Sequence, residues 1–227
     1  MNTIVLMPAA ISFRDVSAAK SIDSLSFEIE AGCSAVIVTS AKNEGALLLR
    51  LITGITHPEN GSVNVLGLPL DGMTSSQIYQ IRQQIGIVPS NGGLISNLKV
   101  LENITLPLLY NTGEISAETE ENIINRLKKL GYSGNIMAMP ALLSSYEKRL
   151  AAFIRATLIK PRIMLYDHCF EDMPVASQKV FSSAASEFHT AISDRTSLYM
   201  MSSEDMAKDL RADVIIKVHK QNLAGTA

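Results

Sequence analysis

Hydrophobic and polar positions divide the chain into short strands and longer helices. Near the start, residues 11–16, 25–29 and 62–66 include runs in which apolar and polar residues alternate, as in half-exposed strands. Residues 35–38 instead form a continuous apolar run, which is typical of a strand buried in a parallel sheet. The first third of the chain is therefore predicted to be rich in strands.

Further along, apolar residues recur at the spacing of amphipathic helices. Helices are predicted at residues 46–54, 75–84, 100–110, 117–130, 145–159, 174–188 and 206–210. Core strands are predicted at residues 85–88, 162–166, 196–201 and 214–218. Because strands alternate with helices, we expect an α/β fold with a mostly parallel core sheet and an antiparallel β part near the N-terminus. We expect residues 1–227 to form a single domain, with a helical subdomain at approximately residues 91–160.

Composition and charge exclude some functional classes. The 227 residues are 47% hydrophobic and 19% charged, as in an ordinary packed protein, and a net charge of -2 gives no support for a nucleic-acid partner. Cys33 and Cys169 are far apart in sequence, which fits a reducing cytoplasm, and Cys33 is expected to be buried before a core strand. No apolar run is long enough to span a bilayer, so any role at a membrane would need a partner.

A strand, a loop and an apolar helix at residues 35–54 form the scaffold of a phosphate-binding loop. Such a loop has the form G-x-x-x-x-G-K-[ST], in which glycines admit backbone N–H groups to the phosphates, the lysine adds charge and the hydroxyl holds Mg²⁺. In this register Thr39 and Glu44 replace the glycines, Gly45 replaces the lysine and Ala46 replaces the hydroxyl residue. The loop consists of Thr39, Ser40, Ala41, Lys42, Asn43, Glu44, Gly45, Ala46 and Leu47.

These substitutions disfavour an anion in the loop. Losing the lysine and gaining Glu44 shifts the local charge by about two units, and unit charges a few ångströms apart near a surface interact by a few kcal/mol. We predict an ordinary helix start, with Glu44 complementing the helix dipole and Asn43 or Ser40 capping the free N–H groups. Lys42 could reach a phosphate from three residues upstream, but we expect a solvated loop charge.

Six segments, in order, resemble those of ABC-transporter ATP-binding subunits. The segment after the family's P-loop helix is resembled by residues 54–63. The strand leading to the Q-loop is resembled by residues 85–90, and the stretch that faces the membrane partner by residues 93–104. Residues 143–156, 161–167 and 211–216 resemble the signature motif with its helix, the Walker B strand and the last strand. The resemblance implies a P-loop NTPase fold of the ABC ATPase type.

The resemblance also implies cofactors, partners and a location. It implies ATP and Mg²⁺, a transmembrane permease partner, and a homodimer or a heterodimer with another ABC subunit. It places the chain in the cytoplasm, peripheral to the inner face of the cell membrane through the permease. Phe170 and residues 93–108 favour the Mla/Mce-type lipid-transport branch.

Residues at the family's catalytic positions are unsuited to their roles. Asp167 ends the Walker B segment and could reach Mg²⁺ through water. His168 stands where the family places the glutamate that polarises the attacking water, and histidine can act as a base near neutral pH. Ser90 stands at the Q-loop glutamine and Ser202 at the switch histidine. We expect none of these positions to be catalytic.

The signature motif L-S-G-G-[Q/E] is also altered. It consists here of Leu143, Ser144, Ser145, Tyr146 and Glu147. The family's glycines admit nucleotide held by the partner subunit, and Tyr146 is predicted to place a large ring there. Because each shared site combines one chain's P-loop with the other's signature, we expect a homodimer to have two inactive sites and a heterodimer two impaired ones.

Three functions remain open from the sequence. The first is a degenerate nucleotide-binding subunit, a structural or regulatory partner of a permease, in which ATP hydrolysis and tight ATP binding are lost. The second is an active ATPase that uses Lys42, Asp167 and His168 in unusual chemistry. The third is a soluble binding module whose cleft takes an apolar or cationic ligand beside Glu44. The family hydrolyses ATP, but these motifs predict no or very weak ATPase activity.

Overall fold

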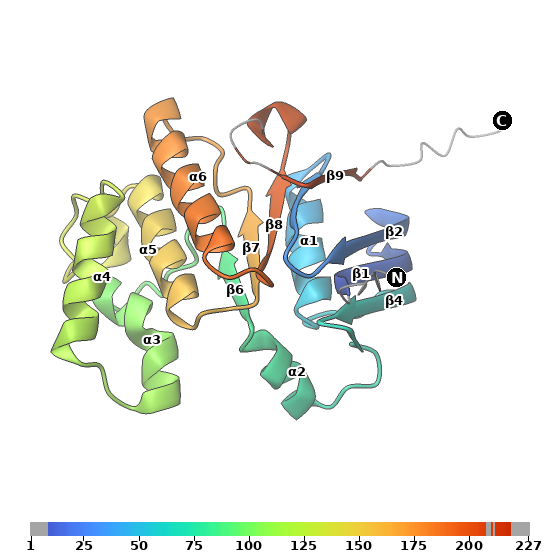
Figure 1. Ribbon diagram of the computed structural model, residues 1–227, viewed down its shortest axis with the longest axis horizontal. Coiled ribbons are helices and arrows are strands. Elements are labelled where there is room, and N and C mark those ends of the chain that lie inside the picture. Colours follow the sequence, from blue (N-terminus) through green and yellow to red (C-terminus); the bar gives the residue numbers. More distant parts are fainter. Residues whose placement is uncertain (1–8, 208–209, 211, 219–227) are drawn as a thin grey trace, which may run out of the picture.

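Within residues 9–207, 210 and 212–218, which the computed structural model describes, the strands form two sheets (Figure 1). The antiparallel sheet contains β1 (Ala9–Ala18), β2 (Ile22–Glu30), β4 (Asn60–Val65) and β5 (Leu68–Pro69), in the order β2-β1-β4-β5. The parallel sheet contains β3 (Ser34–Val38), β6 (Ile85–Val88), β7 (Ile163–Asp167), β8 (Thr196–Met201) and β9 (Val214–Lys217), in the order β6-β7-β8-β3-β9.

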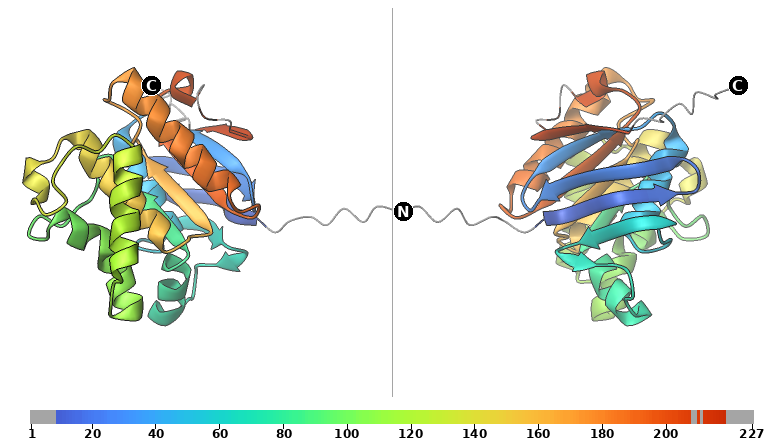
Figure 2. Two further views of the ribbon diagram at one scale, coloured as in Figure 1. Left: turned by 60° about the vertical axis from the view of Figure 1, so that its left-hand side comes forward. Right: turned by 90° about the vertical axis from the view of Figure 1, so that its right-hand side faces the viewer.

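Helix α1 (Lys42–Ile52) lies between the two sheets, and Figure 2 shows the antiparallel strands crossing it. Leu48 and Leu51 of α1 belong to a buried cluster with Phe13 of β1 and Ile37 of β3. Val36, the neighbour of Ile37, belongs to the cluster on the opposite face of the parallel sheet. Successive side chains of a strand point to opposite faces, which explains why both faces of β3 are covered.

Helix α2 (Ser75–Arg82) adds Ile78 and Ile81 to the same cluster as α1. The helices whose buried residues belong to the cluster on the other face are α3 (Val100–Thr112), α4 (Ala117–Lys129), α5 (Ser145–Leu158) and α6 (Val175–Thr190). Single turns lie at Pro140–Leu142 and Glu204–Ala207. Phe153 of α5 packs edge-on against Phe181 of α6, with ring centroids 5.3 Å apart. Tyr166 and Tyr199 stack on the sheet beneath, with centroids 4.6 Å apart. Helices α3–α5 lie together at one end of the molecule (Figure 1).

The predicted α/β architecture, with a mostly parallel core sheet and an antiparallel part, is confirmed. Several details were wrong. Helix α1 begins at Lys42 rather than at residue 46, and the last predicted helix is a turn at Glu204–Ala207, with residues 208 and 209 outside the described part. Cys33 is only half-buried, whereas Cys169 is fully buried. The single domain and the bounds of the helical subdomain stay predictions.

Candidate functional site

Three neighbouring parallel strands bring the predicted site residues to one edge of the sheet. Thr39, His168 and Ser202 directly follow β3, β7 and β8, which pair side by side. The backbone holds these positions together: Thr39 N donates to Met201 O at 2.9 Å, and His168 N to Met200 O at 3.0 Å. The carboxyl ends of parallel strands are where α/β folds usually bind ligands, so this edge is the candidate site.

The loop after β3 is closed by its own helix. Ala41, the N-cap of α1, has no side-chain acceptor. Glu44 Oε2 instead accepts hydrogen bonds from Ser40 N at 2.7 Å and Ala41 N at 3.3 Å. The prediction that Glu44 lies in the first turn is confirmed, whereas Asn43 or Ser40 as the cap was wrong, because the longer Glu44 side chain reaches back to the same N–H groups.

Glu44 is unusual for a capping residue because it is buried. Its residue is only 1% exposed, and Oε1 has no hydrogen-bond partner among the described residues. A buried polar atom without a partner costs free energy, and the charge of the carboxylate adds to that cost. The two backbone N–H groups that face Oε2 are therefore the main compensation for burying this side chain.

Gly45, at the position of the family's lysine, is packed tightly against β7. A Cβ atom at this position would lie 2.6 Å from His168 Cε1 and 2.8 Å from Asp167 Oδ1. Both distances are shorter than van der Waals contact, so any side chain here requires His168 or α1 to move. The chain therefore lacks both the lysine of the family's loop and the space that a lysine side chain would need at position 45.

His168 connects the three strands through a buried chain of hydrogen bonds. Its Nδ1 lies 2.8 Å from Asp167 Oδ1, and its Nε2 lies 3.0 Å from Thr39 Oγ1. This Asp–His–Thr connectivity has the order of a hydrolytic triad. Thr39 is only 2% exposed and His168 only 1%, and both ring nitrogens are engaged. In this arrangement neither side chain is open to solvent.

Glu171 is a site residue that the sequence reasoning missed. Its Oε1 accepts hydrogen bonds from Ser202 N and Ser202 Oγ, each at 2.8 Å. Its Oε2 lies 3.4 Å from Lys42 Nζ, and Asp172 Oδ2 lies 3.1 Å from the same atom. The hydrogen bond to Asp172 raises the pKa of Lys42. The Lys42 side chain is 56% exposed, as predicted for a solvated charge, but Lys42 begins α1 and pairs with both carboxylates. The sequence signal for this site was the pair of carboxylates, Glu171 and Asp172, a few residues after the Walker B segment.

Arg149, also missed, joins α5 to the loops at this edge. The buried guanidinium donates from Nε to Ser90 O at 2.6 Å, and from a terminal nitrogen to Cys169 O at 3.3 Å and to Glu171 O. Ser90 thus contributes its backbone carbonyl rather than its hydroxyl to the recorded contacts. An arginine in the middle of an apolar helix face was the sequence signal.

The altered signature forms an intact start for α5. Ser144 Oγ accepts from Glu147 N at 3.2 Å, and Glu147 Oε2 accepts from Ser144 N at 2.9 Å, which is a capping box. The Tyr146 hydroxyl donates to Leu130 O at 2.8 Å, and the effect of its ring on a nucleotide held by a partner stays a prediction. The half-buried ring packs against the helical core, and burial raises the pKa of its hydroxyl.

Within the described residues there is neither a metal-binding cluster nor a membrane-spanning helix. Residues 9–207, 210 and 212–218 contain no group of three or more His, Cys, Asp or Glu side chains arranged to hold a metal ion. Asp167 as a metal ligand stays a prediction. Among the helices of these same residues, none has both the length and the apolar character needed to cross a membrane.

Comparisons with known proteins identify the family. Residues 22–171 match the family model described as ABC transporter. The intermembrane phospholipid transport system ATP-binding protein MlaF of Escherichia coli K12 is 25% identical over 186 residues, 80% of this chain and 69% of MlaF. The methionine import ATP-binding protein MetN of Haemophilus influenzae is 29% identical over 160 residues, 70% of this chain but 46% of MetN.

A solved structure gives the same result for the fold. The ATP-binding cassette MJ0796, in a dimeric post-hydrolysis state bound to ADP and Pi, matches 92% of this chain and 97% of its own, with a TM-score of 0.77 and 18% identity. The predicted resemblance to ABC ATP-binding subunits is confirmed, and the similar proteins include MlaF of a phospholipid transport system. With a P-loop NTPase fold and a family match over most of its length, this chain belongs to the ABC transporter family.

Proposed function

We propose that this chain is a nucleotide-binding-type subunit of a transport complex that no longer hydrolyses ATP and serves as a structural or regulatory partner of a membrane permease. The observation that carries the proposal is the Glu44 carboxylate on the backbone N–H groups of Ser40 and Ala41. In a working P-loop such N–H groups bind phosphate. Here they are occupied by an anionic group that belongs to the chain itself.

The residues present do not fit a nucleotide phosphate with Mg²⁺. A phosphate at this loop would lie beside the Glu44 charge without the compensating lysine, since position 45 is glycine. Ala46 and Leu47 offer no hydroxyl for a metal ion. Asp167 Oδ1, the oxygen beside position 45, already forms a hydrogen bond with His168 Nδ1. No catalytic step through ATP is therefore derived for this chain.

The retained parts support a role within an assembly. The relatives MlaF and MetN are named as ATP-binding proteins of transport systems. Clusters of buried hydrophobic residues cover both faces of the parallel sheet, and the start of α5 keeps its capping box. We propose that the helical subdomain at about residues 91–160 docks on the permease and thereby holds the chain at the inner face of the membrane. Its dimer partner is either a second copy or another ABC subunit.

The first test is nucleotide binding by the unmodified chain. Isothermal titration calorimetry with ATP and Mg²⁺ should give no binding up to millimolar nucleotide, because Glu44 would have to leave the loop and remain buried without a partner. Micromolar affinity would overturn the proposal.

A second test rebuilds the loop. Glu44→Gly, Gly45→Lys, Ala46→Ser and Leu47→Thr restore the loop chemistry, but the new lysine meets His168. Adding His168→Gly makes room and tolerates the positive φ of 49° at this position. We expect ATP binding by the five-fold variant and none by the four-fold variant. If both stay folded by circular dichroism and neither binds, the closed loop is not what excludes nucleotide.

A third test addresses the permease. The tagged full chain, expressed in its native host, should purify from detergent-solubilised membranes together with an integral membrane protein in near-stoichiometric amount, identified by mass spectrometry. Recovery of the chain only from the fraction without membranes would contradict the role as a permease partner. It would not affect the conclusion from the two nucleotide-binding tests.

A further inference from the structure

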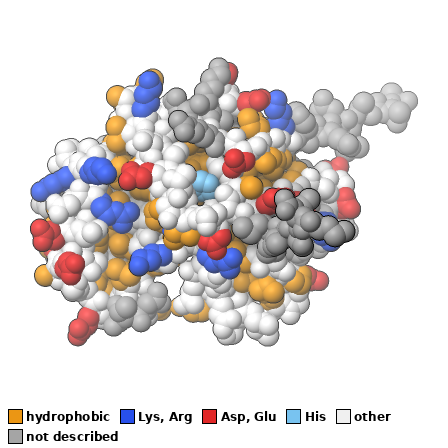
Figure 3. Space-filling model, viewed as in Figure 1, with side chains coloured by type: hydrophobic (Ala, Val, Ile, Leu, Met, Phe, Trp, Pro, Cys, Tyr) orange, Lys and Arg blue, Asp and Glu red, His pale blue; other side chains and the backbone are white. Residues whose placement is uncertain are grey.

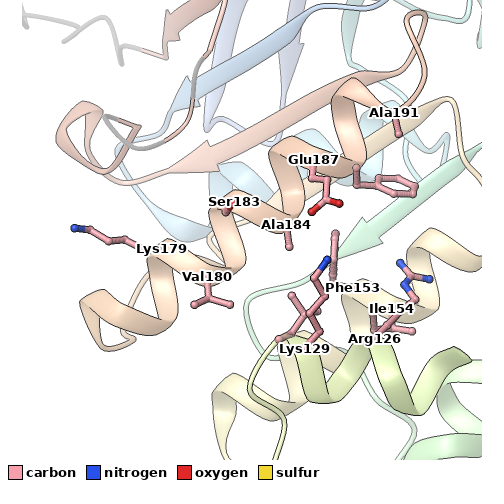
Figure 4. Close-up of a pocket in the computed structure, with 12 residues that line it drawn as sticks. Arg126, Lys129, Phe153, Ile154, Lys179, Val180, Ser183, Ala184, Glu187 and Ala191 are labelled. Carbon is pink, nitrogen blue, oxygen red and sulfur yellow. The ribbon is translucent and has the colours of Figure 1, made fainter. Parts of the chain in front are cut away.

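A groove lies between α6 and the helices α4 and α5, away from the closed loop. Its volume is about 550 Å³, within the range of about 300–1,000 Å³ that is usual for small-molecule pockets. Figure 4 shows Arg126 and Lys129 entering it from α4, with Val180, Ala184 and Glu187 facing them from α6. Its lining residues include none of the P-loop residues 39–47 and none of the signature-motif residues 143–147, although Phe153 and Ile154 belong to the helix that follows that motif.

The floor of the groove is apolar. Phe153 and Ile154 of α5 and Leu130 after α4 are buried there, and the half-buried Phe188 contributes a second ring. The Phe153 and Phe188 rings meet edge-on with centroids 6.2 Å apart. Val180 adds an aliphatic side chain that is 43% exposed. An alkyl chain in the groove would remove the remaining exposed surface of Phe188 and Val180 from water, which is favourable.

The rim of the groove is basic. Arg126, Lys129 and Lys179 line it, and Glu187 is the acidic lining residue. Within residues 9–207, 210 and 212–218, none of these four side chains forms an ion pair, and Arg126 donates instead to Thr157 Oγ1 at 2.7 Å. Burial lowers the pKa of Arg126, so its charge is partly removed from water without an anionic partner. Figure 3 shows basic side chains over this end of the molecule, with acidic side chains and apolar patches among them.

We propose that this groove binds a single-chain amphiphile with a carboxylate head, such as a fatty acid, with the alkyl chain on the Phe153 floor and the head between Arg126 and Lys129. An arginine fork pairs with a carboxylate through two parallel hydrogen bonds. Glu187 on the facing wall disfavours a doubly charged head such as a phosphate monoester. The proposal is independent of nucleotide binding, because its residues lie outside the loop.

The test compares four ten-carbon ligands below their micelle concentrations, by calorimetry on the full chain. Decanoate should bind, decanol should bind at least tenfold more weakly, and decyltrimethylammonium should give no binding. Decyl phosphate should bind more weakly than decanoate. Equal binding of decanol, or tighter binding of decyl phosphate, would overturn the assignment of a carboxylate head.

Variants locate the site. Lys129→Gln should weaken decanoate binding about tenfold, and Ala184→Leu, which fills the groove, should abolish it. Lys128→Gln is the matched control, because Lys128 is exposed on the same helix but does not line the groove. If Lys128→Gln weakens binding as much as Lys129→Gln, the binding is general charge attraction and the proposal is wrong. Both lysines are exposed, so neither variant is expected to unfold the chain.

Discussion

Helices α1 and α5 begin with the same device in two different surroundings. At α5, Glu147 reaches back to Ser144 N at 2.9 Å and remains accessible to water. At α1, Glu44 reaches back to Ser40 N at 2.7 Å but is only 1% exposed. A glutamate three residues after the N-cap is an ordinary helix-start signal in both cases. The difference is that the capping carboxylate of α1 is buried inside the loop, where we propose that it takes the place of a phosphate.

The neighbours of the two starts differ as well. Gly45 of α1 touches His168, which is bonded to Asp167 and Thr39. The matching position of α5 holds the half-buried Lys148. Glu44 and Gly45 of α1 are thus packed into a buried network, whereas Glu147 and Lys148 of α5 are only half-buried. Mutations should therefore have large, coupled effects at α1 and small, independent effects at α5.

The largest expected effect is that of His168→Ala. It leaves the Thr39 hydroxyl and the Asp167 carboxylate without their buried partner, and we expect a loss of about 3–4 kcal/mol in the free energy of unfolding, measured by urea denaturation. His189→Ala is the matched control, because His189 is half-buried and contacts a single hydroxyl, Ser197 Oγ at 3.1 Å. It should cost about 1 kcal/mol. Equal losses for the two histidines would contradict the network.

Next in size is the comparison of the two capping glutamates. Glu44→Ala should cost about 2 kcal/mol, because two buried N–H groups lose a charged acceptor, while removal of the partnerless Oε1 offsets part of that loss. Glu147→Ala should cost about 1 kcal/mol, as usual for an exposed cap. Chemical denaturation at neutral pH measures both. A larger loss in the free energy of unfolding for Glu147→Ala than for Glu44→Ala would contradict the proposed difference between the buried and the accessible glutamate.

The Glu147 cap should also depend on pH. Burial raises the pKa of this carboxyl, but the hydrogen bonds from Ser144 and Ser133 outweigh it and leave the pKa below its ordinary value of 4.5. Its stabilising contribution is therefore complete above pH 4.5 and is lost as the pH falls below that value. The difference in stability between the unmodified chain and Glu147→Ala should shrink in the same range.

A smaller effect is expected from Gly45→Ala. Alanine favours a helix over glycine by about 1 kcal/mol, but here its Cβ lies too close to the His168 ring, so we expect a net loss of about 1–2 kcal/mol. In a His168→Ala background the same change should become neutral or stabilising, which a double-mutant cycle measures. Lys148→Ala, at the matching position of α5, should change stability by less than about 0.5 kcal/mol. If the effects of Gly45→Ala and His168→Ala on stability simply add in the cycle, the proposed contact between the new Cβ and the His168 ring is wrong.

The smallest expected effect is that of Lys42→Met. Lys42 is 56% exposed and pairs with Glu171 and Asp172, so its removal should cost at most about 1 kcal/mol and less at high salt. Because these partners raise the pKa of Lys42, the contribution is present below the ordinary value of 10.5 and is lost as the pH rises above the raised value. A pH-independent difference in melting temperature would show that packing, not charge, is responsible.

The sequence by itself determined the fold class and the location of the candidate site. Period-two and continuous apolar runs separated the antiparallel strands from the buried parallel ones, because each strand's pattern depends on how many of its faces are covered. Motif order then located the loop at Thr39–Leu47 and the altered catalytic positions at Ser90, His168 and Ser202. These features are local in the chain and can therefore be read from it.

Only the tertiary structure decided how the altered residues act together. The neighbours of Gly45, the two partners of His168 and the contacts of Glu171 are contributed by strands and helices far apart in sequence. The sequence likewise gave no indication that Tyr146 turns inward or that α4 and α6 enclose a groove. Which groups are buried, and against which partners, depends on packing between elements. That packing is why Glu44, a local helix cap, is buried with its carboxylate on the backbone N–H groups of Ser40 and Ala41.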